Sequence, residues 1–278
     1  MPATVLFCFS GTGNSLALAR ALAGRLPDTV VVPMLRHEAA AAVDDTTRII
    51  GLVYPIYMNQ VPRLVAGFLG TLCLPANVYV FATPTHGGLP GHAAWHLRLT
   101  CRRLGLPLHA CFPVEMINNT PKGVAPKPLM RLEWETDITP EKVAAAVTAA
   151  DAMVDRIVER VLTREQTNFE SLIAGRRRPG FWMMRLVWWM GSLSHPKLNF
   201  VLDAAACTGC NRCASVCTSG RIRMEHHRPR WNTAHCHYCY ACFNYCPAQA
   251  IGVKHYTKKL GRYHHPRVTP EDIASQRD

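Results

Sequence analysis

The sequence is poor in acidic residues and contains no long apolar run. Its 19 aspartates and glutamates stand against 31 lysines and arginines, which gives a formal net charge of +12. No uncharged apolar stretch approaches the ~18 residues that a transmembrane helix needs, so we expect no membrane span. Strand-like residues follow Pro2 directly, so we also expect no signal peptide and a cytoplasmic protein with reduced thiols.

Two common nucleotide-binding patterns are absent as well. The Gly-containing stretch at residues 10–15 has no lysine before Ser15, which argues against a P-loop. The sequence also contains no G-x-G-x-x-G motif, which argues against a Rossmann dinucleotide site. A phosphate site in this stretch would therefore need a different set of donors.

Cysteine, in contrast, is abundant, and eight of the 12 cysteines lie within residues 207–246. The first run has the spacing C-x2-C-x2-C-x3-C and consists of Cys207, Cys210, Cys213 and Cys217. The second run has the same spacing and consists of Cys236, Cys239, Cys242 and Cys246. It begins 236 − 207 = 29 positions after the first, so the segment is an internal duplication rather than a chance pattern.

The spacing resembles that of the two-cluster bacterial ferredoxins. This resemblance implies two [4Fe–4S] clusters, with the fourth cysteine of each run crossing to the other cluster. The first cluster would be held by Cys207, Cys210, Cys213 and Cys246, and the second by Cys236, Cys239, Cys242 and Cys217. One position departs from the pattern, because Pro247 follows Cys246 whereas Thr218 follows Cys217. We expect the second cluster to form, with a different potential or stability.

Two other uses of these cysteines are disfavoured. Paired C-x2-C elements also build structural zinc sites, but a zinc ribbon needs two cysteines per knuckle and each run here supplies four. Disulfides are disfavoured because closely spaced thiols without a signal peptide do not form a secreted framework. The remaining cysteines, Cys8, Cys73, Cys101 and Cys111, are expected to be buried thiols.

The positive charge is concentrated in the C-terminal part of the chain. Residues 1–165 carry 15 basic and 13 acidic groups, a net of +2, whereas residues 166–278 carry 16 and 6, a net of +10. Two clusters would lower the total by about 2 each. Nucleic-acid binding is disfavoured because no recognition helix and no alternation of aromatic and basic residues is present. We favour a basic face that docks an acidic redox partner, a ferredoxin or a flavodoxin-like donor.

The N-terminal part begins with a strand, a loop and a helix. Residues 3–9 form an apolar run of strand length, and residues 16–26 have the spacing of an amphipathic helix. The loop between them is Ser10-Gly11-Thr12-Gly13-Asn14-Ser15. Its backbone N–H groups and hydroxyls would converge on the positive end of the helix, which suits a single phosphate ester. The alternative is an ordinary turn.

The alternation of strands and helices continues along the chain. Further strands are predicted over residues 30–35, 48–54, 77–83 and 107–117, and helices over 61–72, 92–104 and 139–163. Five strands alternating with helices predict an α/β fold with a doubly wound parallel sheet, followed by a small α+β domain. Ligands of such sheets bind at the carboxyl ends of the strands, so the loops after the first, third and fourth strands form the predicted site.

The order of elements and the first loop resemble a flavodoxin, which implies an FMN cofactor. By position, the phosphate would be bound by Ser10, Gly11, Thr12, Gly13, Asn14 and Ser15. One face of the flavin would be covered by the loop of Pro55, Ile56, Tyr57, Met58 and Asn59. The ring edge would be approached by Thr83, Thr85, His86, Gly87 and Gly88. The last loop has no aromatic residue, which would leave the other flavin face open to a substrate or a cluster.

His86 is the candidate catalytic residue. A histidine in the third flavin loop can serve as a proton donor, and the alternative is a structural or exposed histidine. The strongly acidic surface that is typical of flavodoxins is missing from this chain.

The whole chain resembles a flavodoxin–ferredoxin fusion family. The predicted domains are residues 1–165, flavodoxin-like; 166–200, a linker; 201–256, ferredoxin-like; and 257–278, a tail that resembles the family's closing segment. The resemblance implies an oxidoreductase that relays single electrons between a low-potential partner, the clusters and FMN and reduces a small molecule at the flavin. A pure electron carrier without its own substrate is the alternative.

Two basic or apolar segments remain. Residues 181–193 in the linker are rich in Trp and Met. They either pack between the domains or above the flavin, or contact a membrane surface. Residues 221–231, between the cysteine runs, are expected to form a basic hairpin with a solvated face.

Overall fold

The structure is a computed structural model and describes residues 2–57, 60–88, 90, 93–121, 138–169, 200–232, 236–253 and 261–277. The Trp- and Met-rich segment 181–193 lies outside these residues, as do Met58 and Asn59. Its predicted packing or membrane contact therefore stays a prediction. Over the described ranges, no helix combines the length and the apolar composition needed to cross a bilayer.

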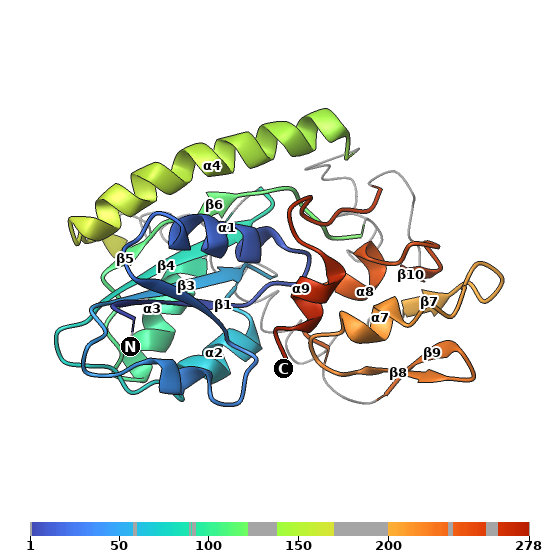
Figure 1. Ribbon diagram of the computed structural model, residues 1–278, viewed down its shortest axis with the longest axis horizontal. Helices are drawn as coiled ribbons and strands as arrows, with labels where there is room; N and C mark the ends of the chain where they lie inside the picture. The colour runs from blue at the N-terminus through green and yellow to red at the C-terminus, as the bar shows by residue number, and fades with distance from the viewer. Residues whose placement is uncertain are drawn as a thin grey trace, which may run out of the picture.

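A parallel sheet organises the N-terminal part (Figure 1). Its strands are β1 (Thr4–Cys8), β2 (Thr29–Pro33), β3 (Ile49–Pro55), β4 (Tyr79–His86) and β5 (Ala110–Cys111). They lie in the order β2-β1-β3-β4-β5, and β6 (Val114–Glu115) also pairs with β4. This is the strand order of the flavodoxin-like doubly wound fold, so the predicted fold class is confirmed.

The central strand is buried on both faces, as its apolar sequence predicts. All five residues of β1 are buried, and Phe7 pairs with Val32 of β2 on one side and Leu52 of β3 on the other. Helices α1 (Asn14–Ala23) and α4 (Pro140–Leu162) pack together on one face of the sheet. Helices α2 (Arg63–Leu69) and α3 (Ala93–Arg103) pack together on the other. A short 3-10 turn, η1 (Ala39–Ala42), follows β2.

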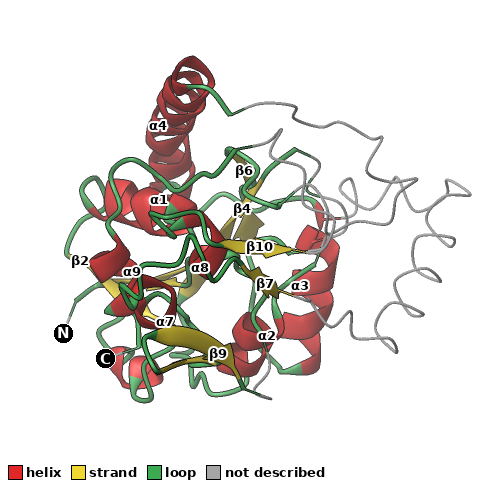
Figure 2. Cartoon of the chain, turned by 90° about the vertical axis from the view of Figure 1, so that its right-hand side faces the viewer, coloured by secondary structure: helices red, strands yellow, loops and turns green. Residues whose placement is uncertain are grey.

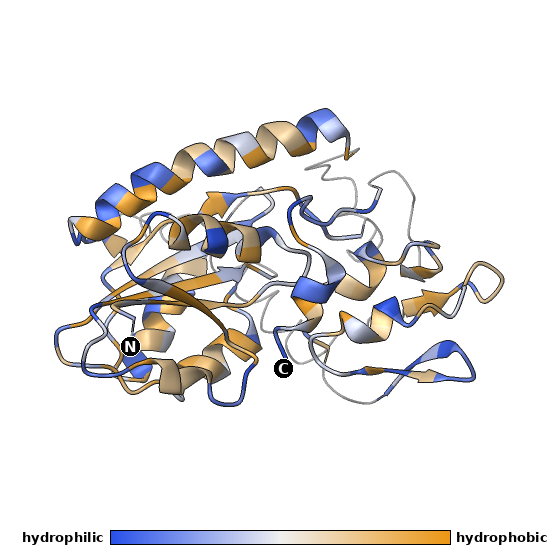
Figure 3. Ribbon diagram, viewed as in Figure 1, coloured by the Kyte–Doolittle hydropathy of each residue, from blue (hydrophilic) through white to orange (hydrophobic). Residues whose placement is uncertain are grey.

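The long helix α4 matches its predicted range. Thr139 caps it by accepting a hydrogen bond from the backbone N–H of Lys142, and Pro140 occupies the first helical position. Its buried residues recur every three or four positions, and Figure 3 shows the resulting alternation of hydrophobic and hydrophilic colours along the helix. This apolar stripe fixes which side of α4 faces the sheet.

Three local predictions were wrong. The fifth strand is not continuous over 107–117 but is divided into β5 and β6, because Pro113 between them has no N–H for the ladder. Strand β4 does not end at Thr83: pairing with β3 and β6 extends it to His86, so Thr85 and His86 lie in a strand rather than a loop. Cys73 is exposed, whereas Cys8, Cys101 and Cys111 are buried as expected.

The C-terminal domain repeats its backbone as well as its cysteines. Helix α7 (Arg212–Ser215) and helix α8 (Ala241–Asn244) are 241 − 212 = 29 positions apart, and the residue before each has a left-handed conformation. Strand β7 (Phe200–Leu202) pairs antiparallel with β10 (Ile251–Val253). Strands β8 (Ile222–Glu225) and β9 (Arg228–Trp231) form the expected hairpin, whose tip is hydrophilic in Figure 3. The duplication is therefore structural.

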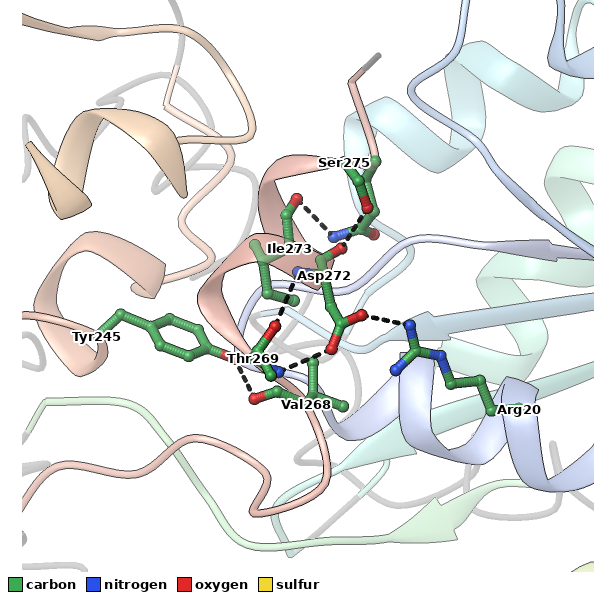
Figure 4. Close-up of polar contacts among 8 residues, drawn as sticks. Arg20, Tyr245, Val268, Thr269, Asp272, Ile273 and Ser275 are labelled. Atoms are coloured by element: carbon green, nitrogen blue, oxygen red, sulfur yellow. Dashed lines mark hydrogen bonds and ion pairs between the residues drawn. The ribbon is translucent and has the colours of Figure 1, made fainter.

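Residues 261–277 lie between the two domains and end in helix α9 (Pro270–Ala274) (Figures 1 and 2). On one side, Asp272 pairs with Arg20 of α1 at 2.5 Å. On the other, the hydroxyl of Tyr245 donates to the backbone oxygen of Val268 at 3.4 Å. Figure 4 shows both contacts around the Thr269 cap of α9. The described part of the predicted tail thus contacts both domains.

Candidate functional site

Four cysteines from both runs line one hollow, which we call the outer set. They are Cys207, Cys210, Cys213 and Cys246. The hollow is closed by Met224 and Pro229 of the β8–β9 hairpin and by Ile251. Burial, followed by the neighbouring Cys246, raises the pKa of the Cys213 thiol to about 11. Cys246 thus lies with the first run, as the crossed ligand scheme requires.

The other four cysteines also lie together, and we call them the inner set. They are Cys217, Cys236, Cys239 and Cys242. Burial, followed by Cys239, Cys217 and Cys236, raises the pKa of the Cys242 thiol well above its usual value. Such thiols become thiolates only when a metal compensates their charge. Within the described ranges, no three His, Cys, Asp or Glu side chains converge closely enough to hold a single metal ion.

The two sets differ in their access to solvent. In the outer set, Cys210 is exposed and Cys207 is half-buried. In the inner set, Cys239 and Cys242 are buried, and Cys239 packs among the core residues of the sheet domain. The outer set therefore faces solvent, and the inner set faces the sheet.

The loop of residues 10–15, here called the anion loop, lies at the carboxyl end of β1. Gly13 at the N-cap of α1 has a left-handed φ of 101°, and no side chain caps the helix. In the described part of the chain, the backbone N–H groups of Gly11, Thr12, Asn14 and Ser15 have no hydrogen-bond acceptor, although all four residues are buried. Buried N–H groups without acceptors at a helix N-terminus favour an anion as the missing partner. The donor set therefore fits a phosphate.

The side chains of the anion loop are held by residues from distant parts of the chain. The hydroxyls of Ser15 and Thr85 are hydrogen-bonded at 2.8 Å. Asn119 donates to the Thr12 hydroxyl oxygen, which leaves the Thr12 hydrogen free to donate elsewhere. The Tyr263 hydroxyl donates to Oδ1 of Asn14 at 2.7 Å. The loop is thus fixed in position while retaining donors for a ligand.

Gln276 completes this support. The backbone N–H of Ser10 donates to its Oε1 at 2.8 Å, and its Nε2 donates to the backbone oxygen of Ser10 at 2.9 Å. The sequence alone does not predict the roles of Asn119, Tyr263 and Gln276, because nothing in their local sequence links them to residues 10–15. Only the path of the folded chain brings them there.

The other two predicted loops lie against each other. The backbone N–H of Ile56 donates to the oxygen of Thr85 at 2.8 Å, and Pro55 pairs with Thr85 in the sheet. Gly87 packs against Asn118, and Gly88 has a positive φ of 115°. The structure thus brings these predicted residues to the same edge of the sheet.

Three buried polar atoms of these segments have no partner among the described residues. They are Oη of Tyr57, Oγ1 of Thr83 and Nδ1 of His86. Burial raises the pKa of Tyr57 well above its usual value and lowers that of His86 below 6.5. Both side chains are therefore neutral at pH 7. Buried polar atoms without partners are uncommon in folded proteins, so these atoms fit a polar ligand such as a flavin ring.

Gly11 is the point where the anion loop, the Tyr57 segment and the inner set meet. A Cβ atom at Gly11 would lie 2.6 Å from Cβ of Cys239 and 2.8 Å from the hydroxyl oxygen of Tyr57. Phe9, just before the loop, contacts Tyr57 and His237 edge-on, with ring centroids 6.2 and 5.9 Å apart. The inner cysteine set is therefore in direct contact with the candidate phosphate site.

The comparisons with known proteins concern the two domains separately. Residues 199–247 match the family model described as a 4Fe-4S dicluster domain. This part of the chain is therefore an iron–sulfur domain, a type of module that carries electrons. No curated protein matches the chain in sequence.

Several solved structures resemble the chain weakly. One is the rubredoxin oxygen:oxidoreductase of Desulfovibrio gigas, at 17% identity and a TM-score of 0.31, where the match covers 55% of this chain and 36% of that one. A Trp repressor binding protein of Bacillus subtilis has 14% identity and a TM-score of 0.34, covering 55% and 97%. An azoreductase of Bacillus anthracis has 11% identity and a TM-score of 0.34, covering 57% and 99%. Similarities this weak do not define the fold class, which the strand order establishes.

Proposed function

We propose that this chain is an iron–sulfur flavoprotein oxidoreductase of the flavodoxin–ferredoxin fusion type. The observation that carries the proposal is the contact at Gly11, where the inner cysteine Cys239 meets the anion loop and Tyr57. In an oxidoreductase, such a contact places an iron–sulfur ligand next to a flavin site. The location of the protein in the cytoplasm belongs to the same proposal.

The residues of the site have distinct tasks. The outer and inner sets would each hold one [4Fe–4S] cluster through four thiolates. The N–H groups of the anion loop and the Thr12 hydroxyl would bind the FMN phosphate, and Tyr57 and His86 would contact the ring. When bound, the clusters carry single electrons and FMN carries one or two, which connects one-electron carriers with two-electron chemistry.

His86 is proposed to hold a proton for a small-molecule substrate. Burial lowers the pKa of His86, and the Gly88 backbone and the charge of Glu115 partly offset this effect. A neutral imidazole carries one N–H and can hydrogen-bond to a reacting group at either ring nitrogen. The proton-donor role of His86 stays a prediction.

The partner of the outer set is proposed to be an acidic electron-transfer protein. One face of the β8–β9 hairpin covers the outer set through Met224 and Pro229. On the neighbouring positions, Arg223 is paired directly opposite Arg230, and both are exposed. Arg230 also lies 3.9 Å from the Glu225 carboxylate, but this pair is exposed and contributes little. Since like charges opposite each other weaken a strand pair, the two arginines favour a role in docking over one in stability. The partner's negative charge would offset this repulsion.

Cofactor content is the first test of this proposal. Anaerobically purified protein should contain about eight irons, matching sulfide and one FMN per chain. Four or fewer irons, or zinc in their place, would overturn the central assignment.

Site variants test the connection between the two domains. Cys210→Ser in the outer set should retain FMN but lose flavin reduction by a reduced ferredoxin. Cys73→Ser, at an exposed cysteine outside both sets, is the matched control and should keep the wild-type rate. Unchanged flavin reduction in Cys210→Ser would refute the role of the outer set.

A pure electron carrier is the second candidate. The observation in its favour is that the anion loop is covered on two sides, at Gly11 by Cys239 and at Gly13 by His265 and Val268. Reduced protein can be mixed with small quinones or with an acceptor protein. Reoxidation by the acceptor protein but not by the quinones would favour the carrier. Turnover of a small quinone would favour the enzyme.

A further inference from the structure

Thr218 distinguishes the two halves of the C-terminal domain. It follows Cys217 and is equivalent to Pro247 of the second run, since 218 + 29 = 247. The Thr218 hydroxyl is buried and lies 3.5 Å from Sγ of Cys239 and 3.1 Å from Nδ1 of His237. Proline has neither a hydroxyl nor an N–H, so Pro247 can offer no donor of this kind to the outer set.

The number of hydrogens fixes the direction of these bonds. A threonine hydroxyl has a single hydrogen, and a cysteine that ligates iron is a thiolate that only accepts. The Thr218 hydroxyl therefore donates to Sγ of Cys239 when a cluster is bound. Its oxygen then accepts from Nδ1–H of His237, which selects one tautomer of that imidazole. The result is a directed chain from His237 through Thr218 to the sulfur.

The sheet domain holds His237 in this arrangement. The His237 ring packs edge-on against Phe9, with centroids 5.9 Å apart, and Phe9 directly precedes the anion loop. His237 therefore cannot turn its ring freely while the domains are in contact. This packing positions the Thr218 hydroxyl from the outside, as supporting residues position the ligands of metal sites.

We propose that Thr218 is a tuning residue that raises the reduction potential of the cluster in the inner set, with His237 as its positioning residue. The proposal rests on the proposed function only in that the inner set binds a [4Fe–4S] cluster. Reduction adds one electron from an external donor and therefore one negative charge to the cluster. A hydrogen bond to a ligand sulfur stabilises the reduced state more than the oxidised state. The effect is larger in a buried site, where water does not screen it.

The test is a reductive titration with dithionite, followed by EPR, on variants that retain eight irons. Thr218→Val keeps the shape but removes the hydroxyl, and Thr218→Pro copies the other run. Both should lower the midpoint potential of the inner cluster without moving that of the outer cluster. Thr218→Ser retains a hydroxyl and should keep the wild-type midpoint potential of the inner cluster. His237→Phe retains ring packing on Phe9 but removes the N–H, and should shift the potential in the same direction by less.

A second readout reports on the hydrogen itself. In deuterated buffer, pulsed EPR of the reduced wild-type protein should show an exchangeable deuteron near the inner cluster that is missing in Thr218→Val. Thr208→Val, beside the outer set, is the matched control for a lost threonine hydroxyl and should retain this deuteron. An unchanged inner potential in Thr218→Val with eight irons present would overturn this proposal alone. Four or fewer irons in the wild-type protein would instead overturn the proposed function.

Discussion

The Cβ atom that Gly11 lacks would lie 2.6 Å from Cβ of Cys239, closer than two such carbons pack in folded proteins. The anion loop and the inner cysteine run are therefore in backbone contact, and glycine is the residue that permits it. Electron transfer depends on short distances between cofactors, so in the proposed function this contact would bring the cluster of the inner set close to the flavin site. It also makes Gly11 a sensitive point for substitution.

We expect Gly11→Ala to separate the two domains at this point. The added methyl would overlap Cβ and the backbone oxygen of Cys239, at 2.6 and 2.8 Å, which are not flexible side-chain ends. Overpacking of this kind costs about 1–3 kcal/mol. The rate of flavin reduction through the clusters should fall by at least tenfold, as measured by stopped-flow absorbance, and the iron content should stay unchanged.

Gly67→Ala is the matched control for this experiment. Gly67 lies within α2, and a Cβ there would contact nothing within 4 Å. Since alanine is the better helix former, this variant should be neutral or stabilised by up to about 1 kcal/mol. Wild-type flavin reduction in Gly11→Ala would show that the domains do not depend on this contact.

Gln276 is expected to contribute strongly to stability, although it lies near the end of the chain. Its amide satisfies both the backbone N–H and the backbone oxygen of Ser10, and the residue is 2% exposed. Gln276→Met keeps the length but leaves both buried backbone groups unpaired, at about 1–3 kcal/mol each. Hydrogen exchange of residues 261–277 should become faster in this variant. Ser275→Ala, at an exposed neighbour, should leave the exchange unchanged.

Because of His265, the free energy of unfolding should decrease as the pH falls below neutral. Burial, with added repulsion from Arg267, lowers the pKa of His265 to about 4, although Asp151 acts in the opposite direction. In the unfolded chain the pKa of a histidine is ~6.5, so the unfolded chain binds more protons than the folded chain between pH 4 and 6.5. The contribution of neutral, buried His265 to the free energy of unfolding is fully present above pH 6.5 and is lost as the pH falls toward 4.

Urea unfolding at a series of pH values tests this expectation. His265→Asn can still accept the hydrogen bond that Nδ1 receives from the backbone N–H of Arg267 but carries no titrating group. The variant should show a flatter dependence of unfolding free energy on pH over that window. His226→Asn, at the exposed hairpin turn, is the matched control for the loss of one histidine. Parallel pH profiles for wild type and His265→Asn would contradict the prediction.

The sequence predicted those features that short stretches determine. The two cysteine runs, the strand–loop–helix unit around residues 10–15 and the capped helix α4 each depend on neighbours within a few positions. The end of β4 was predicted too early because a proline at 84 usually ends a strand, whereas pairing with β3 continues past it. Local pattern alone could not show the strand partners that extend it.

The surroundings of the anion loop lay beyond prediction for a different reason. Ser10 and Gln276 are 266 positions apart, and Asn14 and Tyr263 are 249 positions apart. Nothing in the local sequence around a glutamine or a tyrosine of this polar C-terminal segment indicates which distant residue it will bond to. The contact between Gly11 and Cys239 likewise follows from domain packing and not from either motif.

The basic hairpin should control the rate at which an acidic donor reduces the chain. The Arg223→Gln, Arg230→Gln double variant removes two exposed charges that lie opposite each other and leaves Met224 and Pro229 over the outer set. Rim charges act mainly on association rate, and their effect is screened by salt. The second-order rate constant with an acidic ferredoxin should therefore fall about tenfold at low ionic strength and converge with wild type at high salt. The Arg102→Gln, Arg103→Gln double variant, at the exposed end of α3 in the other domain, removes the same number of charges and tests whether total charge rather than its location matters. The variant loses both the repulsion between the arginines and the weak, exposed pair of Arg230 with Glu225, so stability should change little. A slower reaction in a well-folded variant would therefore point to docking. An equal slowing in the Arg102→Gln, Arg103→Gln variant would contradict docking at the hairpin.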